Sequence, residues 1–301
     1  MLDANAKGVF VIAPTPFADD GALDLQSADS MVDAYLAAGA SGLTILGIMG
    51  EAPKLDAAES ALFVRRVLAR VAGQVPVVVG VSSPGFASMK ALAQEAKAAG
   101  AAGVMVAPTP GLKGDDAVVA YCQQAMDICG DMPFVLQDYP QLTGITLTPA
   151  MLARLLADPR LVMLKAEDWP GLDKLSAIRR AEATGTQRRI AILGGNGGQF
   201  LCEELARGAD GIMTGYAFPE MLVEVCRLMA AGQRDAAQDL FDRHLPLIRT
   251  ELQPGLGLAV RKYVLQRRGI IASAALRAPG PKLSPETRAE VDYLLARITR
   301  G

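Results

Sequence analysis

The chain has 301 residues, of which 51% are hydrophobic and 21% are charged, and its formal net charge is −2. This composition supports a large buried core and excludes an intrinsically disordered chain. No dense basic stripe is interleaved with aromatic residues, and no apolar run reaches about 18 residues. We therefore expect neither a nucleic-acid-binding protein nor a membrane protein.

The four cysteines show no CxxC spacing, which favours reduced thiols in a cytoplasmic protein. The segment from Met1 to Lys7 lacks the basic and apolar regions of a secretory signal. No group of His, Cys and Asp residues has the spacing of metal ligands, so we expect no metal and no cofactor.

Short apolar runs alternate along the chain with Ala- and Leu-rich amphipathic stretches. The runs are Val9–Ala13, Leu43–Leu46, Val75–Val79, Gly103–Ala107, Pro133–Leu136, Leu161–Lys165, Ile190–Leu193 and Gly211–Thr214. They recur roughly every 20–35 residues, which is the repeat of a strand–helix unit. Apolar runs without polar alternation indicate strands that are buried on both faces, as in a parallel sheet. The pattern predicts an α/β fold, a (β/α)8 TIM barrel.

Several intervening stretches carry helix signals. Residues 56–70 have apolar positions at helical spacing, and Thr148 is a candidate N-cap for a helix that begins at Pro149. Gly39, Gly100 and Gly208 each follow a helical stretch between small residues, where a glycine supplies a left-handed helix cap. The repeated use of one device indicates a repeated structural unit.

Beyond Tyr216 no further strand is predicted. Four helices are expected there, over Pro219–Ala230, Asp235–Arg249, Gly257–Arg268 and Pro285–Thr299. No linker rich in Pro, Ser or charge marks an independent domain. We therefore predict a barrel over residues 1–218 and a C-terminal helical extension over residues 219–301, packed together as one structural unit.

Lys165 is the leading candidate for chemistry, because active sites of such barrels lie at the carboxyl ends of the strands. It closes the apolar run Leu161–Leu164, and strand alternation places Glu167 on the same face. Most lysines at strand ends are solvated or ion-paired, but an amine buried in a barrel mouth is favoured in its neutral, nucleophilic form. Glu167 is then either protonated or held away from the amine until substrate arrives.

A second candidate is the turn between the strand at Leu43–Leu46 and the next helix. Its sequence, Gly47 to Pro53, contains glycines that expose backbone N–H groups able to hold a carboxylate. A tight structural turn would use the same residues. The turn is informative only together with Lys165.

The spacing of these residues resembles one known family. The shared pattern is Thr15-Pro16-Phe17, Gly47-x-x-Gly50-Glu51, Pro133 with Pro140, Thr143-Gly144 and the strand ending in Lys165. It is similar to the dihydrodipicolinate synthase/N-acetylneuraminate lyase superfamily over essentially the whole chain. The resemblance implies a homotetrameric barrel that binds a small 2-keto acid as an imine on Lys165. It also implies that Ile48, Met49 and Gly50 receive the substrate carboxylate.

The chain departs from the synthase pattern at the residues that move protons. Ile48-Met49 stand where synthases have two threonines, and Gln137 stands where they have a tyrosine. Leu142 replaces an arginine, and Thr109-Pro110 replace a tyrosine pair. The hydroxyl relay and the second-substrate arginine are therefore missing. These departures disfavour lysine biosynthesis and ordinary sialic-acid lyase chemistry.

Four strings are similar to a narrower branch of the superfamily, the L-2-keto-3-deoxyarabonate dehydratases. They are Gly47–Leu55, Gln137–Pro140, Leu164–Pro170 and Gly194–Gly198. That branch removes water from its substrate and yields 2-oxoglutarate semialdehyde (2,5-dioxopentanoate) in L-arabinose catabolism. The resemblance therefore implies a Schiff-base dehydratase, a lyase.

Within this hypothesis, Glu167 moves the C3 proton or protonates the leaving hydroxyl, unless it only orients Lys165. Tyr139 takes over part of the missing tyrosine's role in carbinolamine breakdown, unless it is a core residue held before Pro140. Gly194 allows close backbone approach to the hydroxyl end of the substrate, and Asn196 is a candidate hydrogen-bond donor to it.

Three alternatives remain open at this point. An aldolase of the same superfamily would cleave a 2-keto-3-deoxy sugar acid to pyruvate. A deaminase of the hydroxyproline pathway would convert a pyrroline-hydroxycarboxylate to the same semialdehyde. A catalytically silent keto-acid sensor would explain the missing relay, but it needs no buried amine such as Lys165.

Overall fold

The computed structural model describes residues 2–168 and 171–299. Trp169 and Pro170, which belong to the Leu164–Pro170 string, lie outside the described residues. In the described part of the chain, no helix is both long enough and apolar enough to cross a lipid bilayer.

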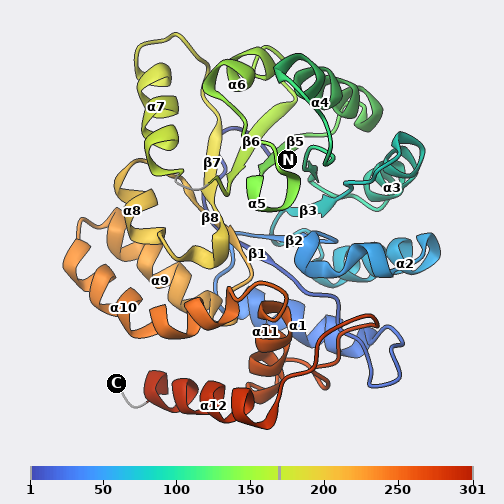
Figure 1. Ribbon diagram of the computed structural model, residues 1–301, viewed down its shortest axis with the longest axis vertical. Helices are drawn as coiled ribbons and strands as arrows, with labels where there is room; N and C mark the ends of the chain where they lie inside the picture. Colours follow the sequence, from blue (N-terminus) through green and yellow to red (C-terminus); the bar gives the residue numbers. More distant parts are fainter. Residues whose placement is uncertain (1, 169–170, 300–301) are drawn as a thin grey trace.

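Eight parallel strands form a closed barrel in chain order, with β1 paired to both β2 and β8. The strands are β1 (Gly8–Ile12), β2 (Gly42–Ile45), β3 (Val77–Gly80), β4 (Gly103–Val106), β5 (Phe134–Asp138), β6 (Leu161–Ala166), β7 (Ala191–Gly194) and β8 (Gly211–Thr214). Figure 1 shows them at the centre of the molecule with the helices around them. The predicted TIM barrel is confirmed.

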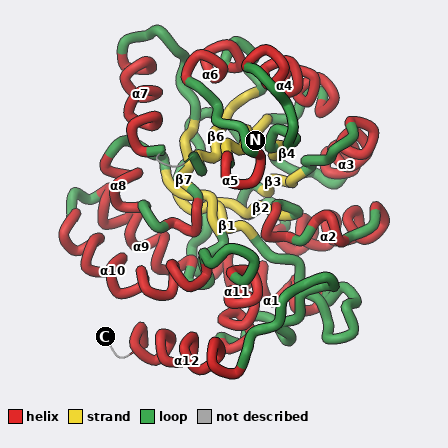
Figure 2. Tube along the Cα trace, in the orientation of Figure 1, coloured by secondary structure: helices red, strands yellow, loops and turns green. Residues whose placement is uncertain are grey.

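The helices alternate with the strands as far as β8, and further helices follow it (Figure 2). The α-helices are α1 (Leu25–Ala37), α2 (Ala57–Val71), α3 (Phe86–Ala98), α4 (Asp115–Cys129), α5 (Pro140–Thr143), α6 (Pro149–Leu155), α7 (Leu172–Ala183), α8 (Leu201–Ala206), α9 (Pro219–Ala230), α10 (Arg234–Glu251), α11 (Gly257–Arg267) and α12 (Pro285–Thr299). Three short 3-10 turns, η1 (Ile48–Gly50), η2 (Ala52–Lys54) and η3 (Asn196–Gly198), follow β2 and β7. The four predicted C-terminal helices are present, whereas the division of the chain after residue 218 stays a prediction.

Three strands begin later than their apolar runs predict: β7, which begins at Ala191 rather than at Ile190, and two strands that follow a proline. β3 begins at Val77 rather than at Val75, and β5 begins at Phe134 rather than at Pro133. Both differences have the same cause, because Pro76 and Pro133 have no N–H group to donate to the ladder.

The predicted helix caps are present. Thr148 accepts a hydrogen bond from the backbone N–H of Met151 at the start of α6. Gly39, Gly100 and Gly208 have φ angles of +82°, +90° and +92°, the left-handed region that a side chain disfavours.

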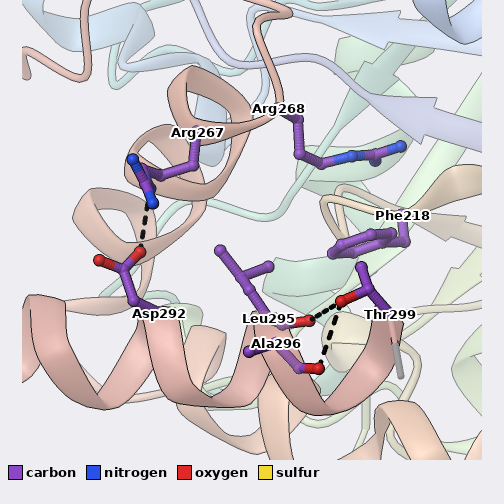
Figure 3. Close-up of a pocket in the computed structure, with 7 residues that line it drawn as sticks. All are labelled: Phe218, Arg267, Arg268, Asp292, Leu295, Ala296 and Thr299. Carbon is purple, nitrogen blue, oxygen red and sulfur yellow. Dashed lines mark hydrogen bonds and ion pairs between the residues drawn. The ribbon is translucent and has the colours of Figure 1, made fainter. Parts of the chain in front are cut away.

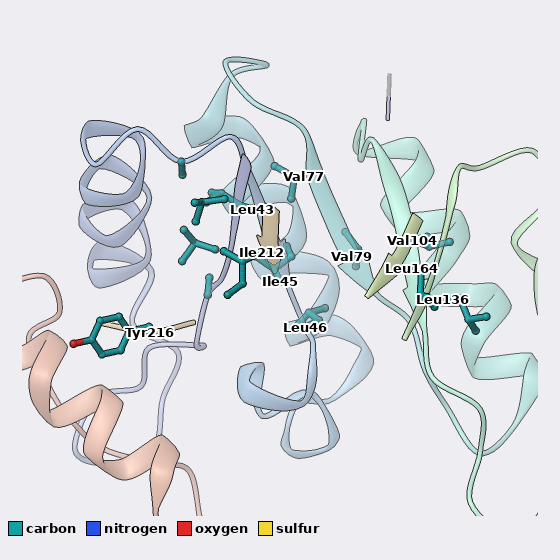
Figure 4. Close-up of a cluster of buried hydrophobic side chains, with 14 of the residues drawn as sticks. Leu43, Ile45, Leu46, Val77, Val79, Val104, Leu136, Leu164, Ile212 and Tyr216 are labelled. Carbon is teal, nitrogen blue, oxygen red and sulfur yellow. The ribbon is translucent and has the colours of Figure 1, made fainter. Parts of the chain in front are cut away.

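Alternation along the strands divides the apolar core into two parts. An inner cluster, which includes Val135, Met163 and Leu193, fills the barrel. A larger outer cluster lies between the strands and the helices, and Figure 4 shows part of it, including Leu136 and Leu164. Because Met163 points inward and Leu164 outward, the next inward position on β6 is Lys165.

Candidate active site

Lys165 lies at the carboxyl end of β6, with only 3% of its surface exposed. Its Nζ atom is 2.7 Å from Oε2 of Glu167, which is itself 7% exposed. The structure therefore places this carboxylate against the amine. Of the two states that the sequence leaves open for Glu167, the one held away from Lys165 is not the one in this structure.

Two other groups donate hydrogen bonds to the Glu167 carboxylate, and a third donates to its backbone carbonyl. The side-chain amide of Gln137 on β5 donates a hydrogen bond of 2.6 Å to Oε2. The backbone N–H of Asn196 donates one of 3.2 Å to Oε1, and the Asn196 amide donates to the Glu167 carbonyl at 3.1 Å. Hydrogen bonds from several donors hold a buried carboxylate in one orientation. Gln137, Lys165, Glu167 and Asn196 thus form one network across β5, β6 and the loop after β7.

Two glycines after β7 make room for carboxyl groups. A Cβ atom on Gly195 would lie 2.2 Å from Cγ of Glu167, and a Cβ on Gly194 would lie 1.8 Å from Oε2 of Glu204 on α8. Side chains at these positions would collide with the two glutamates. The Gly194–Gly195 backbone therefore passes between Glu167 and Glu204, and this packing is a physical reason for glycine at both positions.

Tyr139 directly follows β5 and is partly buried. Burial, together with the nearby negative charge of Glu167, raises the pKa of its phenol above the ordinary value. The hydroxyl therefore stays protonated at neutral pH and can donate a proton rather than accept one. Tyr139 therefore lies within the electrostatic influence of Glu167.

Lys174 on α7 joins the loops that carry these two residues. Its Nζ atom forms ion pairs with Asp138, the residue before Tyr139, and at 3.0 Å with Asp168, the residue after Glu167. Asp138 is nearly fully buried, and burial, offset in part by Lys174, raises its carboxyl pKa to about 6. One cation thus fixes the ends of β5 and β6 relative to each other.

The Ile48–Gly50 turn is at the same end of the barrel, after β2. The Thr15 hydroxyl donates a 2.6 Å hydrogen bond to the carbonyl of Gly50. Ile48 is 40% exposed, whereas Met49 packs partly against the inner core cluster. The side chains at these two positions are apolar, so any carboxylate bound here would have to use backbone N–H groups.

Glu51 anchors this turn to the C-terminal helices. Its backbone adopts the left-handed conformation, and its carboxylate accepts hydrogen bonds from Lys262 on α11 at 2.6 Å and from Lys54 at 2.8 Å. The backbone N–H of Arg277 donates a third bond of 3.1 Å. Lys262 is fully buried, so both charges of the Glu51–Lys262 pair are removed from water.

Two cavities differ in their relation to these residues. One of about 140 Å³ is lined by residues that follow β2 to β5, including Ile48, Pro84, Pro110 and Leu142. It opens at the same barrel end as Lys165 and its walls are mainly apolar. Leu142 is half exposed there.

The larger cavity, of about 490 Å³, lies among α11, α12 and Phe218 (Figure 3). Its two guanidinium groups already have acidic partners, since Arg267 pairs with Asp292 and Arg268 with Glu220. The side chain of Arg268 also covers the ring of Phe218 at 4.1 Å. None of the residues around Lys165 lines this cavity.

Sequence reasoning ranked Lys165, Glu167, Tyr139, Gly194 and Asn196, and the structure places all five around one barrel mouth. Gln137 was not predicted from the sequence as a site residue, and neither Lys174 nor Glu204 was identified from the sequence. For Glu204, the sequence offers one signal, the consecutive glycines at 194 and 195. Adjacent glycines at the end of a buried strand indicate that other groups approach the backbone closely. Among residues 2–168 and 171–299, no cluster of three or more His, Cys, Asp or Glu side chains could hold a metal ion.

Comparison with known proteins gives two kinds of match. A family model described as the dihydrodipicolinate synthetase family matches residues 5–298. An L-2-keto-3-deoxyarabonate dehydratase of Azospirillum brasilense is 30% identical over 295 residues, covering 97% of this chain and 94% of that protein. The 4-hydroxy-tetrahydrodipicolinate synthase 1 of Streptomyces coelicolor is 33% identical over 282 residues, covering 91% of this chain and 88% of that protein.

Among solved structures, a dihydrodipicolinate synthase from Rhodopseudomonas palustris superposes with a TM-score of 0.96. It is 52% identical to this chain and covers 98% of it, with 99% of the R. palustris chain matched. The chain is therefore similar both to proteins named as synthases and to one named as a dehydratase.

Proposed function

Because the chain belongs to the dihydrodipicolinate synthetase family, we propose that it forms a Schiff base between Lys165 and a small 2-keto acid. Members of this family are class I Schiff-base lyases, and the chain is accordingly an enzyme. The support for Lys165 is its position, since its amine is buried at the carboxyl end of β6 where barrel enzymes carry out their chemistry.

We further propose that the substrate is L-2-keto-3-deoxyarabonate and that the product is 2,5-dioxopentanoate. The observation that carries this proposal is the Glu167 carboxylate, which contacts Lys165 and is bonded by Gln137. In a synthase a tyrosine hydroxyl would stand at position 137. In this chain the Gln137 amide is at that position, and the Glu167 carboxylate contacts the Lys165 amine. The similarity to the A. brasilense dehydratase over nearly the whole chain supports the same substrate.

The arrangement suits an elimination of water. Attack of the neutral Lys165 amine on C2 and loss of water give an imine, which acidifies the C3 protons. A base removes one C3 proton to give an enamine, and the C4 hydroxyl then leaves as water after accepting a proton. The net change is loss of one water, which leaves a C3=C4 double bond conjugated with the imine. Removal of a C5 proton and protonation at C3 give a C4=C5 enol, and transfer of the enol proton to C4 makes C5 the aldehyde. Hydrolysis of the imine then frees Lys165 and 2,5-dioxopentanoate. Glu167 is the group placed to take the C3 proton and to return it to the leaving hydroxyl.

Tyr139 has a separate proposed task, because its phenol stays protonated. It donates a proton to the carbinolamine hydroxyl when the imine forms. The turn from Ile48 to Gly50 binds the substrate carboxylate through the backbone N–H groups of Ile48 and Met49, since the Gly50 N–H already donates to the Gly47 carbonyl at 2.9 Å. Asn196 and the Gly194 backbone face the hydroxyl end. A homotetramer and a cytoplasmic location stay predictions, and light scattering in solution tests the first of them.

Product analysis tests the function. Incubation with L-2-keto-3-deoxyarabonate should give 2,5-dioxopentanoate in an amount equal to the substrate consumed. Appearance of pyruvate from this substrate would identify an aldolase, and faster turnover of pyrroline-hydroxycarboxylate would identify a deaminase. Condensation of pyruvate with aspartate semialdehyde would identify a synthase, and each of these three results contradicts the dehydratase proposal.

Two variants test the proton-transfer roles. Glu167→Gln should lower kcat by about 10²–10⁴-fold, the usual contribution of a general acid–base residue. The imine with pyruvate should still form on Lys165 in this variant. Tyr139→Phe should instead slow the formation of that imine, as measured by borohydride reduction and mass analysis. If Glu167→Gln retains full turnover, Glu167 only orients Lys165.

A further inference from the structure

A second carboxyl group lies beside the active site without a role in the chemistry described above. Glu204 is on α8, and its Oε2 atom packs against the Cα of Gly194, where a Cβ atom would approach to 1.8 Å. This oxygen is buried and has no hydrogen-bond partner among the described residues. Glu167 lies on the other side of the same backbone, where it fills the space next to Gly195.

The surroundings of Glu204 disfavour a negative charge. Burial is the main cause, followed by the charges of Glu167 and of Glu203, and together they raise the pKa of the Glu204 carboxyl to about 8. Burial and nearby like charges therefore favour the neutral form of the Glu204 carboxyl.

None of the charged groups described around α8 hydrogen-bonds to the Oε2 atom of Glu204. Arg179 of α7 forms an ion pair with Asp210, and Arg207 forms one with Asp173 of α7. The charges of Arg234 and Asp242 on α10 act on Cys202, and on α9 the side chains of Arg227 and Glu224 pair with each other. The Glu220 carboxylate of α9 pairs with Arg268, and the Cys226 thiol lies near Cys202. β8, from Gly211 to Thr214, contributes no titratable side chain.

We propose that Glu204 is a positioning residue for the Schiff-base reaction, whose neutral carboxyl keeps a second negative charge away from the Lys165–Glu167 pair. This inference rests on the proposed Schiff base. It predicts that imine formation is slowed at alkaline pH, because ionised Glu204 favours the protonated, non-nucleophilic form of the Lys165 amine. The effect is electrostatic and needs no hydrogen bond between the two carboxyl groups, which both lie against the Gly194–Gly195 backbone.

The test compares Glu204→Gln, which keeps the shape but cannot ionise, with Glu203→Gln on the same helix. Glu203 is a matched control because its Oε2 atom is also buried without a partner. Trapping of pyruvate on each protein by borohydride reduction is followed by intact mass from pH 6.5 to pH 9.5. The ratio of the Glu204→Gln rate to the wild-type rate should be near one below pH 7. It should rise about 3- to 10-fold above pH 9, since one pH unit of coupling is tenfold.

Infrared difference spectra give a readout that needs no adduct. Wild type minus Glu204→Gln should show a protonated carboxyl at pH 7 that becomes a carboxylate by pH 9.5. Absence of this band at pH 7, a flat rate ratio, or an equal rise for Glu203→Gln would each overturn the inference. Absence of any wild-type adduct would instead overturn the proposed Schiff base, so the two failures are distinguishable.

Discussion

Lys165→Met should abolish the covalent adduct with a 2-keto acid and lower kcat/KM by about 10³-fold or more. The methionine side chain has similar length but no nucleophile, so no imine can form. Reduction with borohydride in the presence of pyruvate, followed by peptide mass mapping, should mark Lys165 in the wild-type protein and leave the variant unlabelled. An adduct on another lysine of the wild-type protein would contradict the assignment.

The effect of this substitution on folding needs its own control. Lys165→Met leaves the buried Glu167 without its cation, and breaking a buried pair costs about 3–5 kcal/mol. The double variant Lys165→Met/Glu167→Gln removes both charges and should recover much of that loss while remaining inactive. Lys97→Met, which removes an exposed ion pair with Asp131, should retain both labelling and activity.

Glu51→Gln should lower the free energy of unfolding by about 3–5 kcal/mol, because it leaves the fully buried Lys262 ammonium without a carboxylate. Urea denaturation measures this change. The Km for the keto acid should rise as well, since Glu51 fixes the turn from Ile48 to Gly50 that precedes it.

A double-mutant cycle separates the ion pair from other effects of the substitution. The variant Glu51→Gln/Lys262→Met contains no unpaired buried ammonium at this position. Its loss in free energy of unfolding should therefore be smaller than the sum of the losses of the two single variants. Glu95→Gln breaks an exposed pair with Arg65 and should change stability by about 1 kcal/mol or less. Strict additivity of the Glu51 and Lys262 effects would show that the pair is not coupled.

The barrel and the inward, buried position of Lys165 could be predicted because their signals are local. A buried strand repeats its inward direction every second residue, so Met163 and Lys165 share a face and Glu167 continues it. The same reasoning works at Gly39, Gly100 and Gly208, where the end of a helix requires a left-handed residue. These features need no knowledge of which strands are neighbours.

The rest of the site depends on contacts between distant segments. The bond from Gln137 to Glu167 exists because β5 and β6 are paired so that Gln137 lies beside Lys165. Glu204 looks like an ordinary helical residue until α8 is packed on the end of β7. Its side chain is on a helix of six residues with another glutamate beside it, a pattern typical of a solvated surface. Only the adjacent glycines at 194 and 195 hint that it is buried.

The cation that joins the ends of β5 and β6 has a consequence for engineering. Lys174 forms ion pairs with Asp138 and Asp168, so the ends of β5 and β6 that carry Tyr139 and Glu167 are fixed relative to each other. If only the segment after β5 or only the segment after β6 is randomised, the other segment keeps a conformation that suits the original sequence. Substrate range should therefore change most readily when both segments and Lys174 are replaced together by the corresponding residues of one related enzyme.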